Sequence, residues 1–240
     1  MPVFNIVTLF PEFFDSPLKT GLMGKAVASG LVSFNFFNPR DFSLDKHRRV
    51  DDRPFGGGAG MLMTLQPLCS ALEAIPNPGP LLLMSPQGAP FAQKDAVSFA
   101  KEKSLTIICP RYEGADARLE ELFPTRAISV CDAVLNGGET AALAIIEAVA
   151  RLIPGFMGKE ESAREESFSD GLLEYQSYTR PETFRGISAP RVLLNGNRAE
   201  IARLRRQSSL LRTLRIRPDL LSEAPMRASD AAFLKTVPRL

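Results

Sequence analysis

Three short segments of the chain have the composition of ligand-binding loops. They are Ser-Pro-Gln-Gly at 85–88, Arg-Tyr-Glu-Gly at 111–114 and Asn-Gly-Gly-Glu at 136–139, and each follows an apolar run typical of a buried strand. Because parallel strands end at the same edge of a sheet, the three loops are expected to meet there, where open α/β sheets bind ligands. One such loop is weak evidence, since strand-to-helix turns often contain glycine. Together they predict a pocket.

The predicted pocket would offer backbone groups and small side chains rather than many fixed charges. Its acidic residues are Glu113, Asp132 and Glu139. A ligand held by backbone hydrogen bonds and apolar walls, such as an adenine ring, fits this composition better than a naked triphosphate. The single histidine, His47, lies outside the loops, so a Ser-His-Asp or Cys-His arrangement for nucleophilic hydrolysis is disfavoured.

A further segment, 50–61, has four glycines within positions 56–60. Glycine permits a positive φ and lets a bulky group approach the backbone closely. No Gly-Lys-Ser/Thr follows, so a P-loop is not supported. The segment also lacks the spacing of a dinucleotide-binding fingerprint. A ligand-contacting loop and a plain flexible loop both fit it.

The elements that would position these loops alternate between apolar strands and helical patterns. Strands are predicted at 4–9, 81–84, 105–109 and 127–130, and helices at 62–75, 93–103, 115–122 and 140–152. Continuous apolar strands between helices predict an α/β domain whose parallel sheet is covered by helices on both faces. The helix at 140–152 is small and apolar nearly all round. We therefore expect it to be buried within the domain or against a partner subunit.

The character of the sequence changes after residue 158, where a polar and charged stretch has the composition of a linker. We expect an α/β domain over 1–158, a flexible linker over 159–171 and a small helical domain over 172–240, with helices at 199–214 and 228–236. Between 191 and 217 eight arginines face a single acid, Glu200. This charge pattern is expected of a surface that binds a polyanion. A solvated helix face is the alternative.

The composition argues against several classes of protein. The chain has 240 residues, 45% of them hydrophobic and 23% charged, as in ordinary globular proteins. Three scattered cysteines and one histidine do not suggest a disulfide framework or a zinc site, and they fit a reducing cytoplasm. The apolar N-terminal run is too short to span a membrane and lacks the flanks of a signal peptide. We expect a cytoplasmic protein without membrane contact or protein metal ligands.

Longer motifs carry a resemblance to a known family. Arg-Asp-Phe at 40–42, Asp-Lys-His-Arg at 45–48 and Val-Asp-Asp-Arg-Pro-Phe-Gly-Gly-Gly at 50–58 resemble the bacterial tRNA (guanine-N1)-methyltransferases. The segments at 85–88, 111–114, 134–139, 151–155 and 171–181 match the same family in the same order. The resemblance extends from Phe10 to about Leu220.

The resemblance implies a SPOUT-type fold, in which the C-terminal part of the α/β domain forms a deep trefoil knot, a rare exception to unthreaded topology. It implies that the three loops bind S-adenosylmethionine in a bent shape and that the enzyme is a homodimer with its active site at the interface. The implied reaction is methylation of N1 of guanine 37 in the tRNA anticodon stem-loop, when another guanine precedes it. The resemblance does not imply DNA as a partner. It does imply a requirement for Mg²⁺.

The resemblance also assigns roles to particular residues. Arg151 would polarise O6 of the guanine, and Glu166 would be the general base, carried over the pocket when tRNA binds. Asp170 is the nearby alternative base. The residues that would line the cofactor pocket are Ser85, Pro86, Pro110, Tyr112, Glu113, Gly114, Val130, Cys131, Asp132, Ala133, Val134, Leu135, Gly137 and Gly138.

Several positions depart from the pattern of the family. Glu166 stands where relatives have aspartate, and its extra methylene displaces the carboxylate by roughly 1 Å, which predicts an active but slower enzyme. Pro110 replaces a usual glycine, Ala133 a common tyrosine, and Ser177 and Arg198 a frequent histidine. Two alternatives follow: a knotted methyltransferase for another RNA nucleoside, or a catalytically weakened RNA-binding relative.

Overall fold

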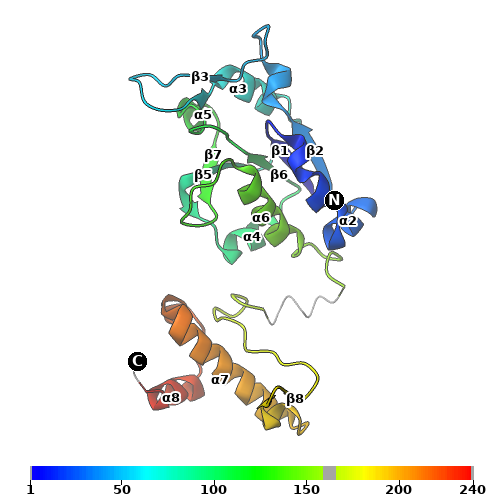
Figure 1. Cartoon of the computed structure of the whole chain (residues 1–240), viewed down its shortest axis with the longest axis vertical. Helices are drawn as coiled ribbons and strands as arrows, with labels where there is room; N and C mark the ends of the chain where they lie inside the picture. The colour runs from blue at the N-terminus through cyan, green and yellow to red at the C-terminus, as the bar shows by residue number, and fades with distance from the viewer. Residues whose placement is uncertain (1, 159–165, 239–240) are drawn as a thin grey trace. The chain divides into compact units, whose positions relative to one another are not determined.

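The computed structural model describes residues 2–158 and 166–238 and divides the chain into two compact units, Met1–Gly158 and Lys159–Leu240. Figure 1 shows strands and helices alternating in the first unit and a mainly helical second unit.

The first unit is built on a five-stranded sheet in the order β2-β1-β6-β5-β7, and every neighbouring pair is parallel. The expected parallel sheet is thus confirmed. Its edge strand β2 was not predicted, because the Ser-Phe-Asn-Phe-Phe run is not continuously apolar and stays largely half-exposed. The strands are β1 (Val3–Val7), β2 (Ser33–Phe37), β5 (Leu81–Pro90), β6 (Ser104–Ile108) and β7 (Thr125–Ser129).

Helices cover both faces of the sheet, as the apolar strands predict. Neighbouring residues of one strand enter different cores: Ile107 packs with α4 (Gln93–Phe99) and α6 (Glu139–Ala150), whereas Ile108 packs with α3 (Leu65–Glu73) and α5 (Arg118–Leu122). This alternation follows from the two-residue period of a strand. Shorter elements complete the unit: η1 (Pro11–Phe14), α1 (Asp15–Lys19), α2 (Gly21–Ala28), η2 (Pro39–Phe42), β3 (Asp51–Asp52) and β4 (Leu62–Met63).

Three predicted helices are shorter than expected. The helix predicted at 62–75 begins at Leu65, because Leu62 and Met63 pair with β3 instead. The helix predicted at 93–103 ends at Phe99, and the one predicted at 115–122 begins at Arg118. Apolar periodicity marks a helix that packs on a core, but it does not mark the residue at which the helix ends.

Helix α6 is buried along one face within its own unit. Ala142, Ile145 and Ile146 are fully buried against the sheet, whereas Ala144 and Glu147 on the other side are exposed. Among the apolar residues of this helix only Ala144 is exposed, and Leu143 and Ala148 are half-buried.

The second unit is organised around the long helix α7 (Arg198–Ile216), whose N-cap Asn197 accepts hydrogen bonds from two backbone N–H groups. A small core of Leu172, Leu210 and Ala224 lies beneath it. The other elements are β8 (Thr183–Phe184), β9 (Ile187–Ser188), η4 (Arg191–Leu193), η5 (Pro218–Ser222) and α8 (Ala228–Thr236).

Of the predicted linker 159–171, residues 159–165 lie outside the described residues and 166–171 form a loop of the second unit. Among the helices that the structure describes, none is both long and apolar enough to cross a membrane.

Candidate active site

The loops that follow β6 and β7 are in direct contact at one edge of the sheet. The N–H of Gly138 donates a hydrogen bond of 2.9 Å to the carbonyl of Pro110. A Cβ on Gly138 would lie 2.7 Å from Cα of Cys109 and 2.9 Å from Cβ of Met84, so only glycine fits between the two neighbouring strands. The predicted convergence of the loops is therefore present in the structure.

The third loop is a bulge in β5. Met84 and Ala89 both pair with Ile128, so residues 85–88 are pushed out of the ladder. The bulge is held tightly, because a Cβ on Gly88 would collide with the backbone of Ile128. Ser85 is half-buried at the start of the bulge and Pro86 is exposed on it.

A buried carboxylate joins the first strand to these loops. Glu139, at the start of α6, is 1% exposed, and its Oε1 accepts a hydrogen bond of 2.8 Å from the hydroxyl of Thr8. Nε of Arg111 lies 3.1 Å from Oε1 and 3.0 Å from Oε2 of Glu139. The guanidinium of Arg111 also lies over the ring of Phe10, 4.5 Å from its centroid. These contacts fix the loop after β6 to the helix after β7.

Sequence reasoning placed Arg111 and Glu139 in the loops but did not foresee this network. Oε2 of Glu139 makes the ion pair without a well-aligned hydrogen bond of its own. Thr8 carries no sequence signal that would pair it with a residue 131 positions away. The network could be found only once the strands were ordered in the sheet.

The loop after β7 presents backbone and apolar side chains to the surface. Val134 is 85% exposed and Leu135 41%, and Tyr112 of the neighbouring loop is 45% exposed. Among the described residues, none accepts a hydrogen bond from the N–H groups of 131–137. Exposed backbone donors beside apolar side chains suit a flat heterocycle with polar edges, so these residues fit an adenine-bearing ligand.

The glycine-rich segment 56–60 lies against the loop after β6. A Cβ on Gly60, whose φ is +82°, would collide with the carboxylate of Glu113. The N–H of Glu113 donates to the carbonyl of Met61 and that of Met63 to the carbonyl of Gly114, both at 2.9 Å. This segment therefore contacts the predicted pocket. The sequence alone did not decide whether it would.

The loop after β6 makes a tight turn. Tyr112 has a φ of +60° and Gly114 a φ of +116°. Pro110 is buried, and its carbonyl is used by Gly138, so the proline is compatible with the packing of the loop although it has no N–H to donate.

The remaining predicted site residues lie in the loop after β7 and beyond it. Val130 is half-buried, whereas Cys131, Asp132 and Ala133 are exposed.

The thiol of Cys109, just before Pro110, has a pKa well above its usual value because of burial and the nearby charge of Glu139, so it stays protonated and unreactive.

The two predicted catalytic residues lie in different units. Arg151 is the half-buried C-cap of α6, and its N–H donates to the carbonyl of Glu147. A cation at this end of a helix complements the helix dipole. Glu166 belongs to the second unit, where its carbonyl accepts a hydrogen bond from Ser169. In the part of the chain that the structure describes, no group of three acidic, histidine or cysteine side chains could hold a metal ion.

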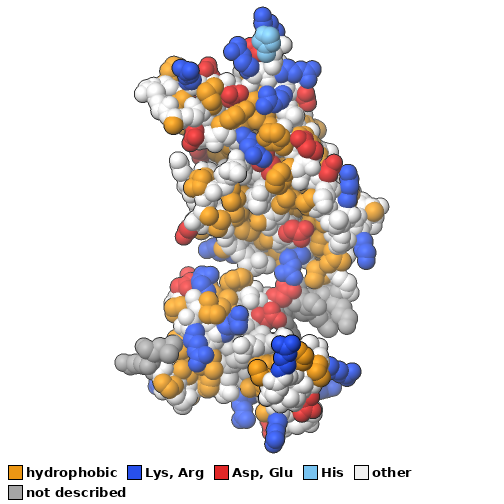
Figure 2. All heavy atoms as spheres, in the orientation of Figure 1, with side chains coloured by type: hydrophobic (Ala, Val, Ile, Leu, Met, Phe, Trp, Pro, Cys, Tyr) orange, Lys and Arg blue, Asp and Glu red, His pale blue; other side chains and the backbone are white. Residues whose placement is uncertain are grey.

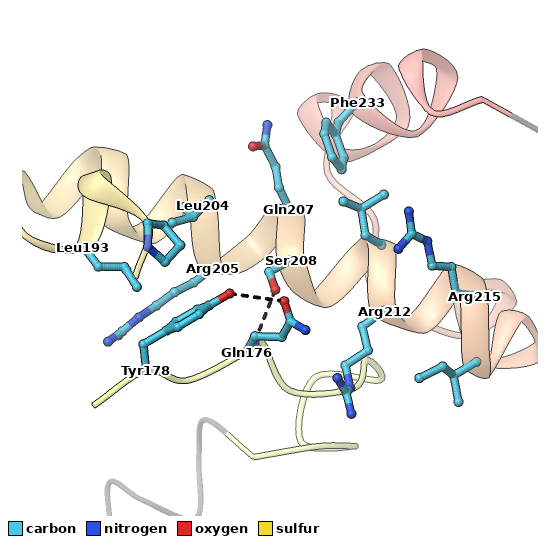
Figure 3. Close-up of a pocket in the computed structure, with 13 residues that line it drawn as sticks. Gln176, Tyr178, Leu193, Leu204, Arg205, Gln207, Ser208, Arg212, Arg215 and Phe233 are labelled. Carbon is cyan, nitrogen blue, oxygen red and sulfur yellow. Dashed lines mark hydrogen bonds between the residues drawn. The ribbon is translucent and has the colours of Figure 1, made fainter. Parts of the chain in front are cut away.

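The second unit contains a cavity of about 440 Å³ along α7 (Figure 3). Tyr178 lies over one end with its hydroxyl directed to Gln176, and Arg205, Arg212 and Arg215 line the helix side. Apolar groups close the rest. In the face seen in Figure 2, Lys and Arg side chains of this unit outnumber its acidic side chains. The cavity thus combines an aromatic ring, apolar surface and positive charge.

Comparison with known proteins gives a consistent result. The family model described as tRNA (Guanine-1)-methyltransferase TrmD matches residues 3–223. Proteins called tRNA (guanine-N(1)-)-methyltransferase in Oleidesulfovibrio alaskensis and Nitratidesulfovibrio vulgaris are each 57% identical over 98% of the chain, which covers 56% and 55% of their lengths. The chain therefore spans about half the length of these two relatives. A protein of the same name in Geotalea uraniireducens is 47% identical over 99% of the chain and 97% of its own length.

Proposed function

The chain belongs to the tRNA (guanine-1)-methyltransferase family, and from this premise we propose that it methylates N1 of guanine in tRNA with S-adenosylmethionine as the methyl donor. The position of that guanine is 37, next to the anticodon, with a guanine before it. The observation that carries the proposal is the meeting of three loops around Gly138, at the sheet edge where such a cofactor would bind.

The cofactor pocket consists of the loops after β5, β6 and β7. The exposed backbone of 131–137 would hydrogen-bond the adenine, while Val134, Leu135 and Tyr112 would pack against its faces. Ser85, Pro86, Glu113 and the exposed residues 131–133 would complete the pocket. When bound, the cofactor supplies a sulfonium-activated methyl group.

The catalytic step requires removal of a proton from guanine N1, which is a poor nucleophile while protonated. Glu166 supplies the carboxylate that accepts this proton. Negative charge then develops on O6 of the guanine, and the guanidinium of Arg151 stabilises it. Glutamate in place of the aspartate of relatives keeps the base but lengthens its reach. A requirement for Mg²⁺ belongs to the same proposal, and no residue is assigned to hold the ion.

The second unit would hold the tRNA. The cavity along α7 offers Arg205, Arg212 and Arg215 for phosphates and Tyr178 for stacking on an unpaired base. Arginine and aromatic side chains together are the usual means of binding single-stranded RNA loops. The anticodon stem-loop has both features.

The finer parts of the fold also belong to this proposal. A trefoil knot belongs to the proposal because of the family to which the chain belongs, and the close packing of Gly138 on Cys109 and Met84 is compatible with it. A homodimer, with each active site completed by the other subunit, is supported by the exposed Ala144 face of the otherwise apolar α6. The tRNA substrate and the three free cysteines are consistent with the cytoplasm.

A methyl-transfer assay on tRNA transcripts tests the proposal. We expect 1-methylguanosine in a transcript with guanine at 36 and 37, and a loss of at least about 100-fold in rate when either guanine is replaced. Methylation of a different nucleoside would contradict the proposed substrate. Cofactor binding without transfer to any transcript would contradict the enzymatic function itself.

A further inference from the structure

The residues that follow Glu166 form a closed loop. The N–H of Phe168 donates a hydrogen bond of 2.7 Å to the carbonyl of Leu172, and the N–H of Ser169 donates to the carbonyl of Glu166 at 3.2 Å. The N–H of Glu174 donates to the hydroxyl of Ser167 at 3.0 Å. Residues 166–174 are called the base loop below. Its internal hydrogen bonds give it a defined shape.

The base loop is anchored to the helices of its own unit. Leu172 is fully buried in the small core with Leu210 and Ala224. The N–H of Leu173 donates to the hydroxyl of Thr213 at 2.9 Å, and that hydroxyl donates to the carbonyl of Ser209 one turn earlier in α7. These contacts hold the C-terminal half of the loop.

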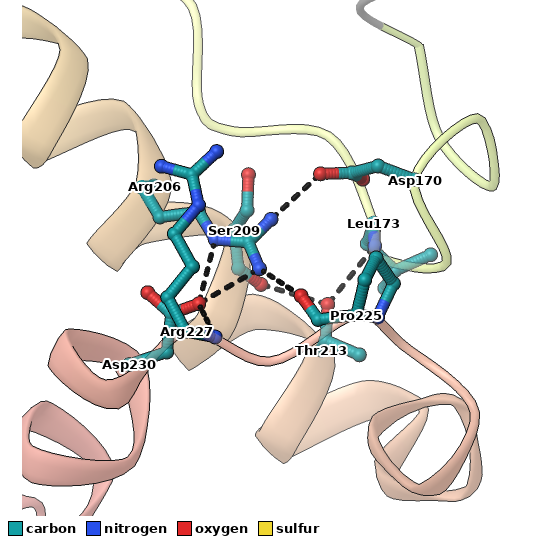
Figure 4. Close-up of polar contacts among 8 residues, drawn as sticks. All are labelled: Asp170, Leu173, Arg206, Ser209, Thr213, Pro225, Arg227 and Asp230. Carbon is teal, nitrogen blue, oxygen red and sulfur yellow. Dashed lines mark hydrogen bonds and ion pairs between the residues drawn. The ribbon is translucent and has the colours of Figure 1, made fainter.

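Arg206 holds the other half through a set of ionic contacts (Figure 4). Its side chain is 14% exposed, and its guanidinium lies 2.6 Å from the carboxylate of Asp170 and 2.8 Å from that of Asp230. It also donates to the carbonyl of Pro225 at 3.0 Å. The same oxygen of Asp230 accepts the N–H of Arg227 at the start of α8. One side chain of α7 thus connects the base loop, the turn before α8 and α8 itself.

Arg206 is held in place independently of the base loop. Burial tends to raise the pKa of Asp230, but the hydrogen bonds from Arg206 and from the N–H of Arg227 lower it, so the carboxylate is ionised at neutral pH. The Arg206–Asp230 pair is therefore a fixed structural contact. Asp170, which is 57% exposed, is the residue of the base loop that pairs with this fixed guanidinium.

We propose that Asp170 and Arg206 are positioning residues for catalysis: their ion pair fixes the base loop on the second unit and so orients the carboxylate of Glu166 for its reaction with the tRNA. The inference rests on the proposed role of Glu166 as the general base. It also gives Asp170 a role other than the alternative base considered above, because its carboxylate is engaged by the guanidinium. A base on a fixed loop reaches the guanine with less loss of conformational freedom than one on a free chain.

The variant that tests the proposal is Asp170→Asn. Replacing Arg206 would leave the buried Asp230 without its partner and could unfold the unit, whereas Asp170 is mostly exposed. Asp219→Asn is the matched control. Asp219 is 60% exposed and lies 2.6 Å from Arg217 in the same unit, and this partner does not belong to the base loop. Glu166→Gln and the double variant Glu166→Gln/Asp170→Asn complete the set.

The rate of methyl transfer is measured in a single turnover at saturating tRNA, with a tritiated methyl donor, and dissociation constants are measured in parallel. We expect Asp170→Asn to lower the rate about tenfold and to change the dissociation constants of tRNA and cofactor less than about twofold. Asp219→Asn should match the unchanged protein. In the Glu166→Gln background, Asp170→Asn should have no further effect, because it acts through Glu166.

Other outcomes would overturn the inference in distinguishable ways. An unchanged rate in Asp170→Asn, or the same tenfold loss with and without Glu166, would show that the ion pair does not position the base. An unchanged rate in Glu166→Gln would instead refute the proposed base. If Asp170→Asn alone abolished transfer in that case, Asp170 would be the base.

Discussion

A carboxylate as deeply buried as that of Glu139 is stable only where donors replace its lost hydration. Thr8 and Arg111 provide this replacement: Thr8 directly follows β1, and Arg111 lies in the loop after β6, which forms part of the proposed pocket. The same contacts therefore contribute to stability and to the shape of the cofactor site. Removing one of them should affect both.

At the scale of the residue, we predict that Glu139→Gln weakens cofactor binding about tenfold and lowers the free energy of unfolding by about 3 kcal/mol. The loss lies at the low end for a buried ion pair, because Arg111 remains 22% exposed. Isothermal titration with S-adenosylmethionine and urea denaturation measure the two effects. Thr8→Val removes two hydrogen bonds, the one that the hydroxyl donates to Glu139 and the one that it accepts from the N–H of Phe10, and should cost about 2 kcal/mol. Equal cofactor affinity in Glu139→Gln and the unchanged protein would contradict this role.

Single residues of the site differ in how far the sequence predicts them. The glycines at 88, 114, 137 and 138 predict loops from the sequence alone, since their positions after apolar strands already indicate tight turns. The partners of Glu139 are different. Thr8 directly follows an ordinary strand, and only the sheet order β1-β6-β5 brings it near the start of α6. Contacts between residues distant in sequence have no local signature.

At the scale of the element, the contact between the three loops depends on Gly138. We predict that Gly138→Ala lowers the free energy of unfolding by about 1–3 kcal/mol, because the added methyl would overlap backbone atoms that cannot move aside. Cofactor binding should weaken by at least about tenfold. Gly158→Ala is the control, since a Cβ there meets no atom within 4 Å. Thermal unfolding and cofactor titration of both variants measure the two effects. A Gly138→Ala protein with the stability and cofactor affinity of the control would refute the packing argument.

The elements themselves were predicted where they pack on both faces of the sheet. The apolar runs of β1, β5 and β6 and the helix α6 have a clear sequence signal, because these elements are buried and burial determines their sequence. The edge strand β2 and the two-residue strands β3 and β4 have little buried surface and hence little signal. The bulge in β5 likewise depends on its pairing with β7.

At the scale of the whole molecule, charge in the second unit should govern how strongly tRNA binds. We predict that Arg212→Gln/Arg215→Gln weakens tRNA binding by about tenfold and lowers the slope of log Kd against log salt by about 1 to 2, since up to two phosphate contacts are lost. Cofactor affinity should stay the same. Filter binding over a range of salt concentrations measures the slope. Arg118→Gln, in the first unit, is the control, and an unchanged slope in the double variant would place the RNA elsewhere.

The arrangement of the whole chain was only partly accessible from sequence. The change of composition after residue 158 and the arginine-rich stretch near the C-terminus suggest two units of different character. A threaded topology has no counterpart in hydrophobic periodicity, and its expectation came from resemblance alone. The docking of 166–171 on the second unit was also not expected, because a polar sequence looks the same whether it is free or held by one half-buried arginine.

The hydrogen bond between Thr8 and Glu139 has a consequence for biosynthesis. It connects residues 131 positions apart, so the ribosome must have made more than half of the chain before the bond can form. Strands β1 and β2 are translated early, but the sheet neighbour β6 and the start of α6 emerge much later. During translation the edge of β1 that pairs with β6 therefore stays unpaired until β6 has been made. The pocket is among the last parts of the first unit to assemble.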